Sequence, residues 1–306
     1  MVSVLLATFN GEAYLPALLS SLQAQTEEEM RILWQDDGSS DITPSLLASA
    51  QGPFLPGTQQ GQRLGAAGNF LSLMRQDDAP ACALCDQDDL WRPDKLARCL
   101  AALRQAEAES GADVPILVHH DCRVVAADGT PLRPSLMRHQ GWDSRAADLP
   151  RLLVQNNVTG CTCVMNAALR RLVADHAPAE RLFMHDWFIA QTAAAFGRIV
   201  YVDEPLVDYR QHGSNVLGAS RTGLIRRGLS ALRTPQRAKA RIRLTWEQTR
   251  VFRDAYGDLL SSQAAAIVGD YLAIESLPKM QRIASIRQGG YLMQSRIARI
   301  GQMLFT

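Results

Sequence analysis

Residues 2–41 read VSVLLATFNGEAYLPALLSSLQAQTEEEMRILWQDDGSSD, and they contain one complete unit of a recognisable fold class. Val2–Ala7 is an apolar run that ends in the turn-forming residues Thr-Phe-Asn-Gly, which predicts a buried strand and a turn. Apolar residues then recur at helical spacing over 14–22, and Arg31–Trp34 is a second apolar run closed by the acidic turn 36–41. A strand, a helix and a second strand in this order predict a parallel α/β sheet.

The same alternation continues through the first two thirds of the chain. Apolar runs over 81–84, 116–119 and 199–202 predict further strands, and apolar periodicity predicts helices after Pro93 and around 185–188. Sheets of this kind bind ligands at the carboxyl ends of their parallel strands. We therefore expect a Rossmann-like, mostly parallel sheet flanked by helices, with the chemically active side chains along one edge.

Composition excludes several classes of protein. The chain has 306 residues, of which 47 % are hydrophobic and 21 % charged, so it can bury a large core. Only Cys82 and Cys85 among its six cysteines have CxxC spacing, and no second such pair follows, which favours core positions over zinc or disulfides. The N-terminus lacks the basic region of a signal peptide, and no run of about 18 apolar residues could span a membrane. We expect a cytoplasmic protein.

The near-neutral net charge of +1 conceals a strong asymmetry. Residues 1–220 carry 17 Lys/Arg and 26 Asp/Glu, whereas residues 221–306 carry 15 and 5, giving net charges of −9 and +10. The sequence therefore predicts an α/β domain over 1–220 and a basic, amphipathic helical extension over 221–306. Two apolar stripes support the extension, Leu224/Ile225/Leu229/Leu232 and Ile286/Met293/Ile297/Ile300/Leu304.

Paired carboxylates follow two of the predicted strands. Asp86 and Asp88 are two residues apart directly after an apolar strand, a spacing that lets both bind one Mg²⁺ or Mn²⁺ ion. A cation held there could bridge the phosphates of a nucleotide diphosphate. A solvated acidic turn is the alternative. Asp36 and Asp37 close a neighbouring strand, so both pairs should lie at the same edge of the sheet.

Two later motifs carry further polar chemistry. In His185-Asp186-Trp187, the indole could stack on a sugar face and the carboxylate could accept a proton, although such groups are also frequent in cores and helix caps. The stretch 209–215 is predicted to be a polar loop, in which His212 could complete a metal site and Arg210 could bind phosphate. A solvated loop is the alternative for that stretch.

Five motifs in order resemble glycosyltransferase family 2, in particular its bacterial rhamnosyltransferase-like members of cell-surface polysaccharide synthesis. The resemblance covers about 70 % of the chain, from Val2 to Val216, and leaves the basic extension outside. The motifs are Thr8-Phe9-Asn10-Gly11, Asp36-Asp37-Gly38-Ser39-Ser40-Asp41, Asp86-Gln87-Asp88-Asp89-Leu90-Trp91, His185-Asp186-Trp187 and Tyr209-Arg210-Gln211-His212-Gly213-Ser214-Asn215.

This resemblance implies a GT-A fold, a nucleotide-sugar donor and inversion at the anomeric carbon. It implies donor contacts from Thr8, Asn10, Asp36, Asp37, Asn69, Asp86 and Asp88, although helix capping is the alternative for Asn69. It further implies that Asp186 is the catalytic base, that His185 and Trp187 lie beside the acceptor, and that Asp88, Asp86 and His212 bind the metal. Many relatives carry Arg before the Asn at the position of Asn69, whereas Gly68 precedes it here. Arg63 or Arg210 is therefore expected to supply the missing diphosphate contact.

The resulting hypothesis is a metal-dependent inverting glycosyltransferase that moves rhamnose from dTDP-rhamnose, or a hexose from a UDP-hexose, to a glycan or lipid-linked acceptor. Three alternatives use similar residues: a nucleotide-sugar-binding scaffold without catalysis, a nucleotidyltransferase and a glycoside hydrolase. A catalytic carboxylate at Asp186 disfavours the scaffold, and a nucleotide site disfavours the hydrolase.

The basic extension has no aromatic platform between its arginines, which disfavours nucleic-acid binding. Arg-rich amphipathic helices suit an anionic membrane surface, where residues 221–306 would bring the acidic domain to a polyprenyl-linked acceptor at the inner face. Packing of these helices on the α/β domain, or pairing in a homodimer, is the alternative.

Overall fold

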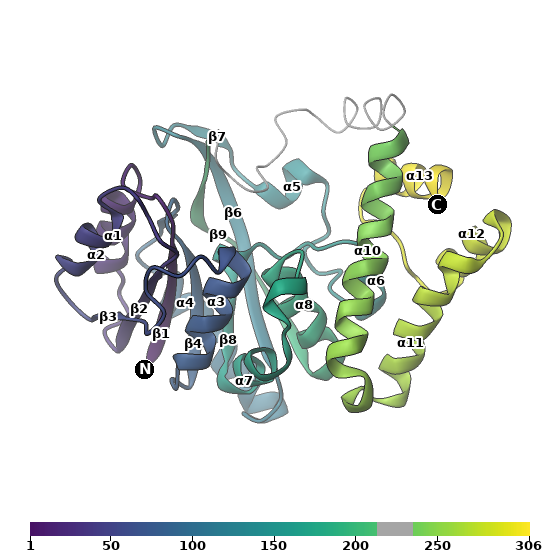
Figure 1. Ribbon diagram of the computed structural model, residues 1–306, viewed down its shortest axis with the longest axis horizontal. Helices are drawn as coiled ribbons and strands as arrows, with labels where there is room; N and C mark the ends of the chain where they lie inside the picture. The colour runs from purple at the N-terminus through teal and green to yellow at the C-terminus, as the bar shows by residue number, and fades with distance from the viewer. Residues whose placement is uncertain (213–234) are drawn as a thin grey trace.

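The computed structural model describes residues 1–212 and 235–306 and contains one mixed sheet covered by helices on both faces (Figure 1). Within the described residues the strand order is β3-β2-β1-β4-β8-β6-β9-β5, with β7 paired to β6. The strands are β1 (Val2–Thr8), β2 (Met30–Asp36), β3 (Phe54–Pro56), β4 (Ala81–Asp86), β5 (Leu90–Trp91), β6 (Ile116–Ala126), β7 (Pro131–Arg133), β8 (Val164–Asn166) and β9 (Arg198–Gln211).

The N-terminal half of the sheet is parallel, as predicted. β2 pairs in parallel with β1 and β3, and β1 pairs in parallel with β4. Thr8 is opposite Asp36, and Ala7 is opposite Asp86, so three neighbouring strands end together. The short strand β8 runs antiparallel between β4 and β6, and β9 is parallel to β6. The expected edge of polar residues is therefore confirmed.

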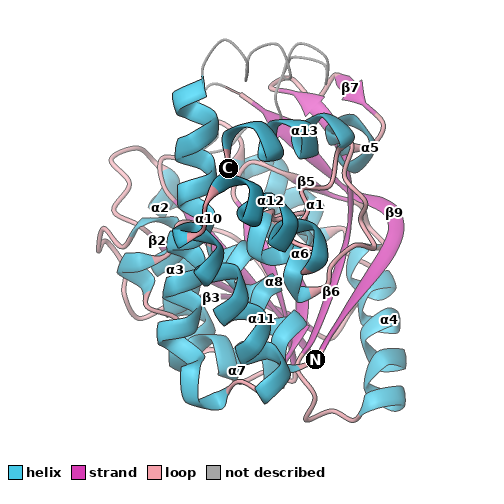
Figure 2. Ribbon diagram, turned by 90° about the vertical axis from the view of Figure 1, so that its right-hand side faces the viewer, coloured by secondary structure: helices cyan, strands magenta, loops and turns pink. Residues whose placement is uncertain are grey.

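Helices cover the two faces of the sheet, and β1 shows how the sequence divides between them. Leu5 and Leu6 are fully buried in opposite hydrophobic clusters, because successive strand residues point to opposite faces. Figure 2 shows α4 on one side of the strands and α7, α8 and α10 on the other. The helices before residue 213 are α1 (Leu15–Gln23), α2 (Thr43–Ala48), α3 (Gly65–Gln76), α4 (Lys95–Ser110), α5 (Leu136–Gln140), α6 (Leu149–Val154), α7 (Ala167–His176) and α8 (His185–Phe196).

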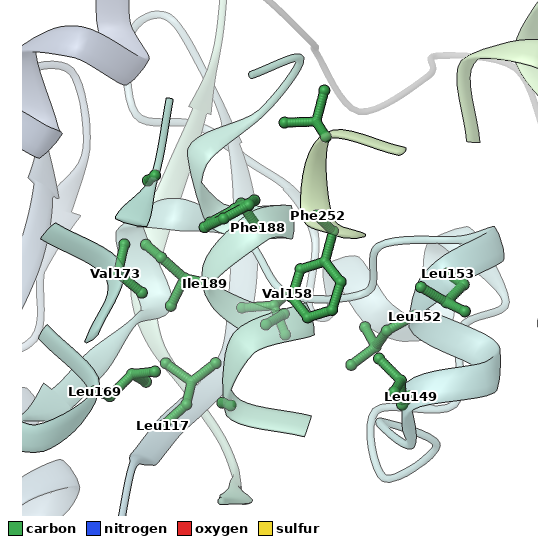
Figure 3. Packing of buried hydrophobic residues seen from close by; sticks show 14 of the residues in the cluster. Leu117, Leu149, Leu152, Leu153, Val158, Leu169, Val173, Phe188, Ile189 and Phe252 are labelled. Carbon is green, nitrogen blue, oxygen red and sulfur yellow. The ribbon is translucent and has the colours of Figure 1, made fainter. Parts of the chain in front are cut away.

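The C-terminal helices pack on the α/β body. They are α10 (Pro235–Tyr256), α11 (Ser262–Ala273), α12 (Lys279–Gln288) and α13 (Arg296–Phe305). The ring centroids of Phe252 and Tyr256 on α10 lie 5.8 Å and 5.4 Å from that of Phe188 on α8, and Leu152 of α6 belongs to the same cluster (Figure 3). The predicted helical character of the tail is confirmed, and the division at residue 220 stays a prediction.

Two local predictions are wrong. The stripe from Ile286 to Leu304 does not lie on one helix, because α12 ends at Gln288 and α13 begins at Arg296. Gly290 has φ +72° between them, a conformation that glycine adopts without strain. Residues 209–211, expected in a loop, instead end the long strand β9.

All six cysteines are buried and free, which confirms the core interpretation. Among the described residues, no helix is both long and apolar enough to cross a membrane. The stripe at Leu224–Leu232, most of the basic cluster over 221–243, and the predicted loop residues 213–215 lie outside the described residues.

Candidate active site

At the ends of β1 and β2, the residues predicted to contact the nucleotide-sugar donor hold one another in place. The Thr8 hydroxyl donates to Asp36 Oδ1 at 3.0 Å, and the Ser39 amide donates to Asp36 Oδ2 at 2.7 Å. Asp37 accepts the backbone N–H of Leu64, and that of Gly65 at 2.9 Å. Both carboxylates are buried, so they shape the loops at this edge. Their contacts to a base or ribose stay predictions.

The turn after β1 and the start of α3 place three more of the predicted residues. Asn10 adopts a φ of +49° and accepts the Ser40 amide at 2.9 Å through its side chain. The Arg63 guanidinium lies 4.3 Å from the centre of the Phe9 ring. The amide of Asn69 is buried and donates to a backbone carbonyl of β2 at 3.1 Å, and its contact with a donor stays a prediction.

Gln87 joins the loop after β4 to the turn after β1, a role that the sequence analysis did not assign. Its Oε1 accepts the Phe9 N–H at 2.7 Å, and its Nε2 donates to the Phe9 carbonyl at 2.8 Å. A Cβ atom on Gly11 would stand 2.3 Å from Gln87 Oε1, so only glycine leaves room for this contact. The two loops that carry Thr8 and Asp86 are thereby held at a fixed spacing.

The loop 86–89 brings together oxygen ligands with unusual electrostatics. Burial, and then the neighbouring Asp88, raises the pKa of Asp86 to about 7. Burial also raises the pKa of Asp89, whose Oδ1 accepts the Arg210 N–H at 3.1 Å. Ligand atoms of Asp86, Asp89 and Cys161 lie within 4.8 Å of one another. This group shares Asp86 with the predicted metal set of Asp86, Asp88 and His212.

Asp88 and His212 nevertheless meet at the same edge. His212 Nε2 lies 2.6 Å from Asp88 Oδ2, and the imidazole stacks on Tyr14 with 4.5 Å between ring centroids. The Arg210 guanidinium lies 4.8 Å from the Tyr14 ring centre, and its Nη1 donates to the Ala127 carbonyl at 2.9 Å. At this separation the imidazole and the carboxylate bond directly to each other, and a carboxylate is the kind of ligand that Mg²⁺ or Mn²⁺ prefers. The ligand assignment stays a prediction.

Asp186 lies in the first turn of α8 and is almost wholly buried, with 5 % of its surface exposed. Its carboxylate accepts N–H groups from Asn156 and Gly160 at 3.1 Å each and from Trp187 at 2.6 Å. Burial raises the pKa of Asp186 to about 7 against these hydrogen bonds, which lower it. A carboxyl group titrating near neutrality is suited to accept a proton from a hydroxyl.

Gly160 connects Asp186 to the donor edge. Its N–H binds Asp186, and a Cβ atom on it would stand 3.7 Å from Asp86 Oδ2 and 3.1 Å from His185 Nε2. The negative charge of Asp186 in turn contributes to the raised pKa of Asp86. The structure therefore brings the carboxylates of two motifs 100 residues apart in sequence to one small glycine.

The two neighbours of Asp186 lie in different surroundings, and the place of His185 beside an acceptor stays a prediction. His185 stacks on Phe70 with 4.4 Å between ring centroids, and burial lowers its pKa to about 4. Trp187 is 4 % exposed, and its indole N–H donates to the Leu152 carbonyl. The expectation that Trp187 stacks on an acceptor sugar is not met in this structure, because α6 and α8 cover the ring.

Four residues enter the site that the sequence prediction omitted: Gln87, Asp89, Lys95 and Asn156. Lys95 is fully buried, and its ammonium donates to the Cys161 carbonyl at 2.8 Å and lies 3.0 Å from the Trp91 ring centre. Asp89 and Gln87 stood within a motif already singled out. Asn156 gave no local signal, since its partner is 30 residues away.

The fold places several carboxylates at the carboxyl ends of neighbouring strands, where sheets of this kind bind ligands. A family model described as glycosyl transferase family 2 matches residues 3–176. Because that match covers more than half of the chain, the protein belongs to glycosyltransferase family 2. Membership places it among the transferases of sugars from nucleotide-sugar donors rather than among nucleotidyltransferases or hydrolases.

Individual relatives are distant. The chain is 28 % identical over 223 residues to an uncharacterized glycosyltransferase of Nostoc, covering 70 % of this chain and 66 % of the relative. It is 24 % identical over 245 residues to the dTDP-rhamnosyl transferase RfbG of Shigella flexneri, covering 72 % and 79 %. The crystal structure of S. aureus TarS 1–349 superposes with a TM-score of 0.57 at 16 % identity, covering 99 % of this chain and 88 % of TarS. That last similarity concerns the fold.

Proposed function

We propose that the protein is an inverting glycosyltransferase in which Asp186 is the catalytic base. The observation that carries the proposal is the position of this buried carboxylate, with a pKa raised to about 7, beside Asp86 across Gly160. A base must lie next to the donor's anomeric carbon, and Asp86 belongs to the edge at which the donor is expected. Asn156 and Gly160 hold the base by hydrogen bonds, which fixes the direction of proton transfer.

In the proposed reaction, Asp186 accepts a proton from an acceptor hydroxyl as that oxygen attacks the anomeric carbon. The bond to the diphosphate breaks on the opposite side, which inverts the configuration. Arg63 and Arg210 are proposed to bind the departing diphosphate. A divalent cation, Mg²⁺ or Mn²⁺, held by Asp88 and His212 with Asp86, would neutralise charge on the leaving group. Thr8, Asn10, Asp36 and Asp37 shape the nucleotide pocket.

The proposed donor is dTDP-rhamnose, with a UDP-hexose as the second candidate. The similarity to the dTDP-rhamnosyl transferase RfbG favours the first, over 72 % of this chain. The fold similarity to a TarS structure determined with UDP-GlcNAc, at a TM-score of 0.56, keeps the second open. The proposed acceptor is a hydroxyl of a glycan or of a polyprenyl-linked saccharide.

Asp186→Asn tests the role of the base. Asn keeps the hydrogen-bonding shape but cannot accept the proton, so transfer should fall by at least 10²-fold while donor binding is retained. Release of nucleoside diphosphate from each donor with Mn²⁺ measures transfer, and calorimetric titration measures donor affinity. Asp148→Asn, in a carboxylate that caps α6 away from this site, is the matched control. Turnover of the Asp186 variant near that of the wild type would refute the assignment.

We also propose that the C-terminal helices hold the protein at an anionic membrane surface on the cytoplasmic side. Ile300 and Leu304 on α13 are 62 % and 47 % exposed, and Met280 on α12 is 77 % exposed. Lys279 Nζ donates to the Leu304 carbonyl at 2.9 Å, so the start of α12 lies beside the end of α13. Arg296 and Arg299 are exposed on the same helix as Ile300. Apolar side chains flanked by arginines match the interfacial region of a bilayer.

A further inference from the structure

Lys95 is a buried cation that the proposed reaction does not use. It is the first residue of α4, shortly after the loop 86–89, and 0 % of its surface is exposed. Lysine is almost never fully buried unless neighbouring groups compensate its charge, because an ammonium group loses much hydration when it leaves water. The groups around the ammonium of Lys95 therefore indicate what this residue does.

Two contacts hold the ammonium group in place. Nζ donates to the Cys161 carbonyl at 2.8 Å and lies 3.0 Å from the centre of the Trp91 ring. A carbonyl oxygen and an aromatic face both attract a cation, but neither neutralises its charge. Within residues 1–212 and 235–306, no carboxylate forms an ion pair with Lys95. Its charge therefore acts through space on the acidic groups nearby.

Those acidic groups are the carboxylates of the donor edge. The pKa of Asp86 is raised to about 7, chiefly by burial and then by the charges of Asp88 and Asp186, and the positive charge of Lys95 opposes this rise. Ligand atoms of Asp86 and Asp89 lie within 4.8 Å of the thiol of Cys161, the residue whose carbonyl binds Lys95. Charges buried together in this way interact more strongly than they would in water.

The Cys161 carbonyl also connects Lys95 to the proposed base. Cys161 is the middle residue of a short 3₁₀ helix, Gly160–Thr162, and directly follows Gly160. The Gly160 N–H donates to Asp186 Oδ2 at 3.1 Å. One turn of backbone is therefore bonded to the ammonium of Lys95 on one side and to the carboxylate of Asp186 on the other, so a shift of this turn would move the proposed base.

We propose that Lys95 is a positioning residue for sugar transfer and the buried counter-charge of the donor edge. By binding the Cys161 carbonyl, its ammonium group fixes the turn that holds Asp186. Its positive charge also weakens the attraction of the neighbouring carboxylates for a divalent cation, which keeps cation binding reversible. The first consequence rests on the proposed function, whereas the second concerns metal binding alone.

Two variants separate the charge of Lys95 from its hydrogen bond. Lys95→Met keeps a long apolar side chain and loses both properties, whereas Lys95→Gln loses the charge and keeps an N–H donor. Arg104→Met is the matched control, because it removes an equal charge from an exposed position of the same helix. Denaturant unfolding of the full-length proteins shows that each variant is folded. If Lys95→Met does not fold, Lys95→Gln alone decides both measurements below.

The first measurement is a Mn²⁺ titration without donor, followed by the relaxation of water protons. Both Lys95 variants should bind Mn²⁺ about fivefold more tightly than the wild type, because a repulsion between two cations is removed. Arg104→Met should stay within about twofold of the wild type, because solvent screens the charge it removes. Replacing a residue that only supports the fold would instead weaken Mn²⁺ binding.

The second measurement is nucleoside diphosphate release at saturating Mn²⁺. In Lys95→Met, kcat should fall about tenfold or more, the worth of one charge-assisted hydrogen bond, while the donor KM stays within about twofold of the wild type. In Lys95→Gln, kcat should fall less, because an N–H donor still reaches toward the Cys161 carbonyl. Arg104→Met should keep both constants.

Either of two results would overturn the inference. One is that the Lys95 variants bind Mn²⁺ no more tightly than the wild type, which includes the case that none of the proteins binds it. The other is that both variants keep the kcat of the wild type. Mn²⁺ binding needs no turnover, so Lys95→Met should tighten it by the same factor in the Asp186→Asn background. Full activity of Asp186→Asn together with this tightening would refute the proposed base and support the counter-charge role of Lys95.

Discussion

Asp186, the proposed base, is buried at a cost in stability. Its position in the first turn of α8 and its three N–H donors favour the charged form, yet burial is the largest influence and raises its pKa to about 7. In the unfolded chain the same carboxyl titrates near 3.9. Between about pH 4 and pH 7 the folded protein therefore holds a proton that the unfolded chain has released.

This difference predicts a pH-dependent free energy of unfolding. As the pH rises from about 4 to 7, ionisation of Asp186 lowers the stability of the folded state. Asparagine does not ionise, so Asp186→Asn removes that loss. The free energy of unfolding of the variant minus that of the wild type should therefore be about 2 to 4 kcal/mol larger at pH 8 than at pH 4.5. Urea unfolding at both pH values with a chelator present measures it. If the free energies of unfolding of the wild type and the variant changed with pH in parallel, burial would not be raising the pKa of Asp186.

Gln87 gives a second prediction at the scale of single residues. Gln87→Ala removes both hydrogen bonds to Phe9 and should lower stability by about 1 to 2 kcal/mol while raising the donor KM. Gln87→Glu keeps the acceptor and loses the donor, so its donor KM should be intermediate. Gln105→Ala, which removes an exposed hydrogen bond on α4, is the control for unfolding and kinetics. An unchanged donor KM in Gln87→Ala would show that the two loops do not need this contact.

The sequence could identify Asp86 and Asp88 because strand, turn and carboxylate lie within a few residues of each other. It could not assign Asp89, because its hydrogen-bond partner, the backbone N–H of Arg210, is 121 residues away. The prediction that Trp187 stacks on a sugar was wrong for a related reason. In sequence, an indole beside a carboxylate looks the same in a sugar site and in a core. Its burial comes from α6, which no local pattern around residue 187 reveals.

At the scale of elements, α8 connects the proposed catalytic edge to the C-terminal helices. Its first turn carries Asp186, and two residues later Phe188 packs on Phe252 and Tyr256 of α10. Thr192 Oγ1 also lies 3.2 Å from the Tyr256 hydroxyl. Helical periodicity was enough to predict that the tail is helical. It could not predict this docking, because the partner surface comes from helices that are distant in sequence.

Phe252→Ala tests the docking of α10. Removing a fully buried ring should lower the free energy of unfolding by about 3 to 5 kcal/mol, and transfer should fall because α8 loses its support. Leu259→Ala, at a side chain that is 52 % exposed just after α10, should change stability by less than about 0.5 kcal/mol. Denaturant unfolding and nucleoside diphosphate release are the two measurements. A loss below about 1 kcal/mol for Phe252→Ala would mean that α10 does not stabilise the fold as its packing indicates.

On the scale of the whole molecule, the acidic body and the basic tail form one packed structure. The charge asymmetry was visible in the sequence, and its arrangement was not. Because α10 and α11 complete the hydrophobic core around α8 and α6, deletion of residues 221–306 would expose that core and could not test membrane binding cleanly. Substitutions on the exposed surface of α13 are the better experiment.

Ile300→Ser combined with Leu304→Ser should abolish co-flotation with vesicles that contain phosphatidylglycerol, because the apolar contact with the bilayer is lost. The wild type should float with these vesicles at low salt, less so at high salt, and not with pure phosphatidylcholine. Ile42→Ser, at a side chain 58 % exposed beside α2, is the control. Equal flotation of the double variant and the control would exclude α13 as the anchor.

The packing of α10 on α8 also has a consequence for synthesis on the ribosome. The strands that end in Thr8, Asp36 and Asp86 emerge first, and N-terminal regions generally fold before later ones during translation. The apolar side of α8 gains Phe252 and Tyr256 only when the chain is nearly complete. A nascent chain is therefore expected to assemble the proposed nucleotide-binding edge before Asp186, the proposed base, is rigidly held. A chain released before α10 is made is then expected to keep that edge and to lack the packing that supports Asp186.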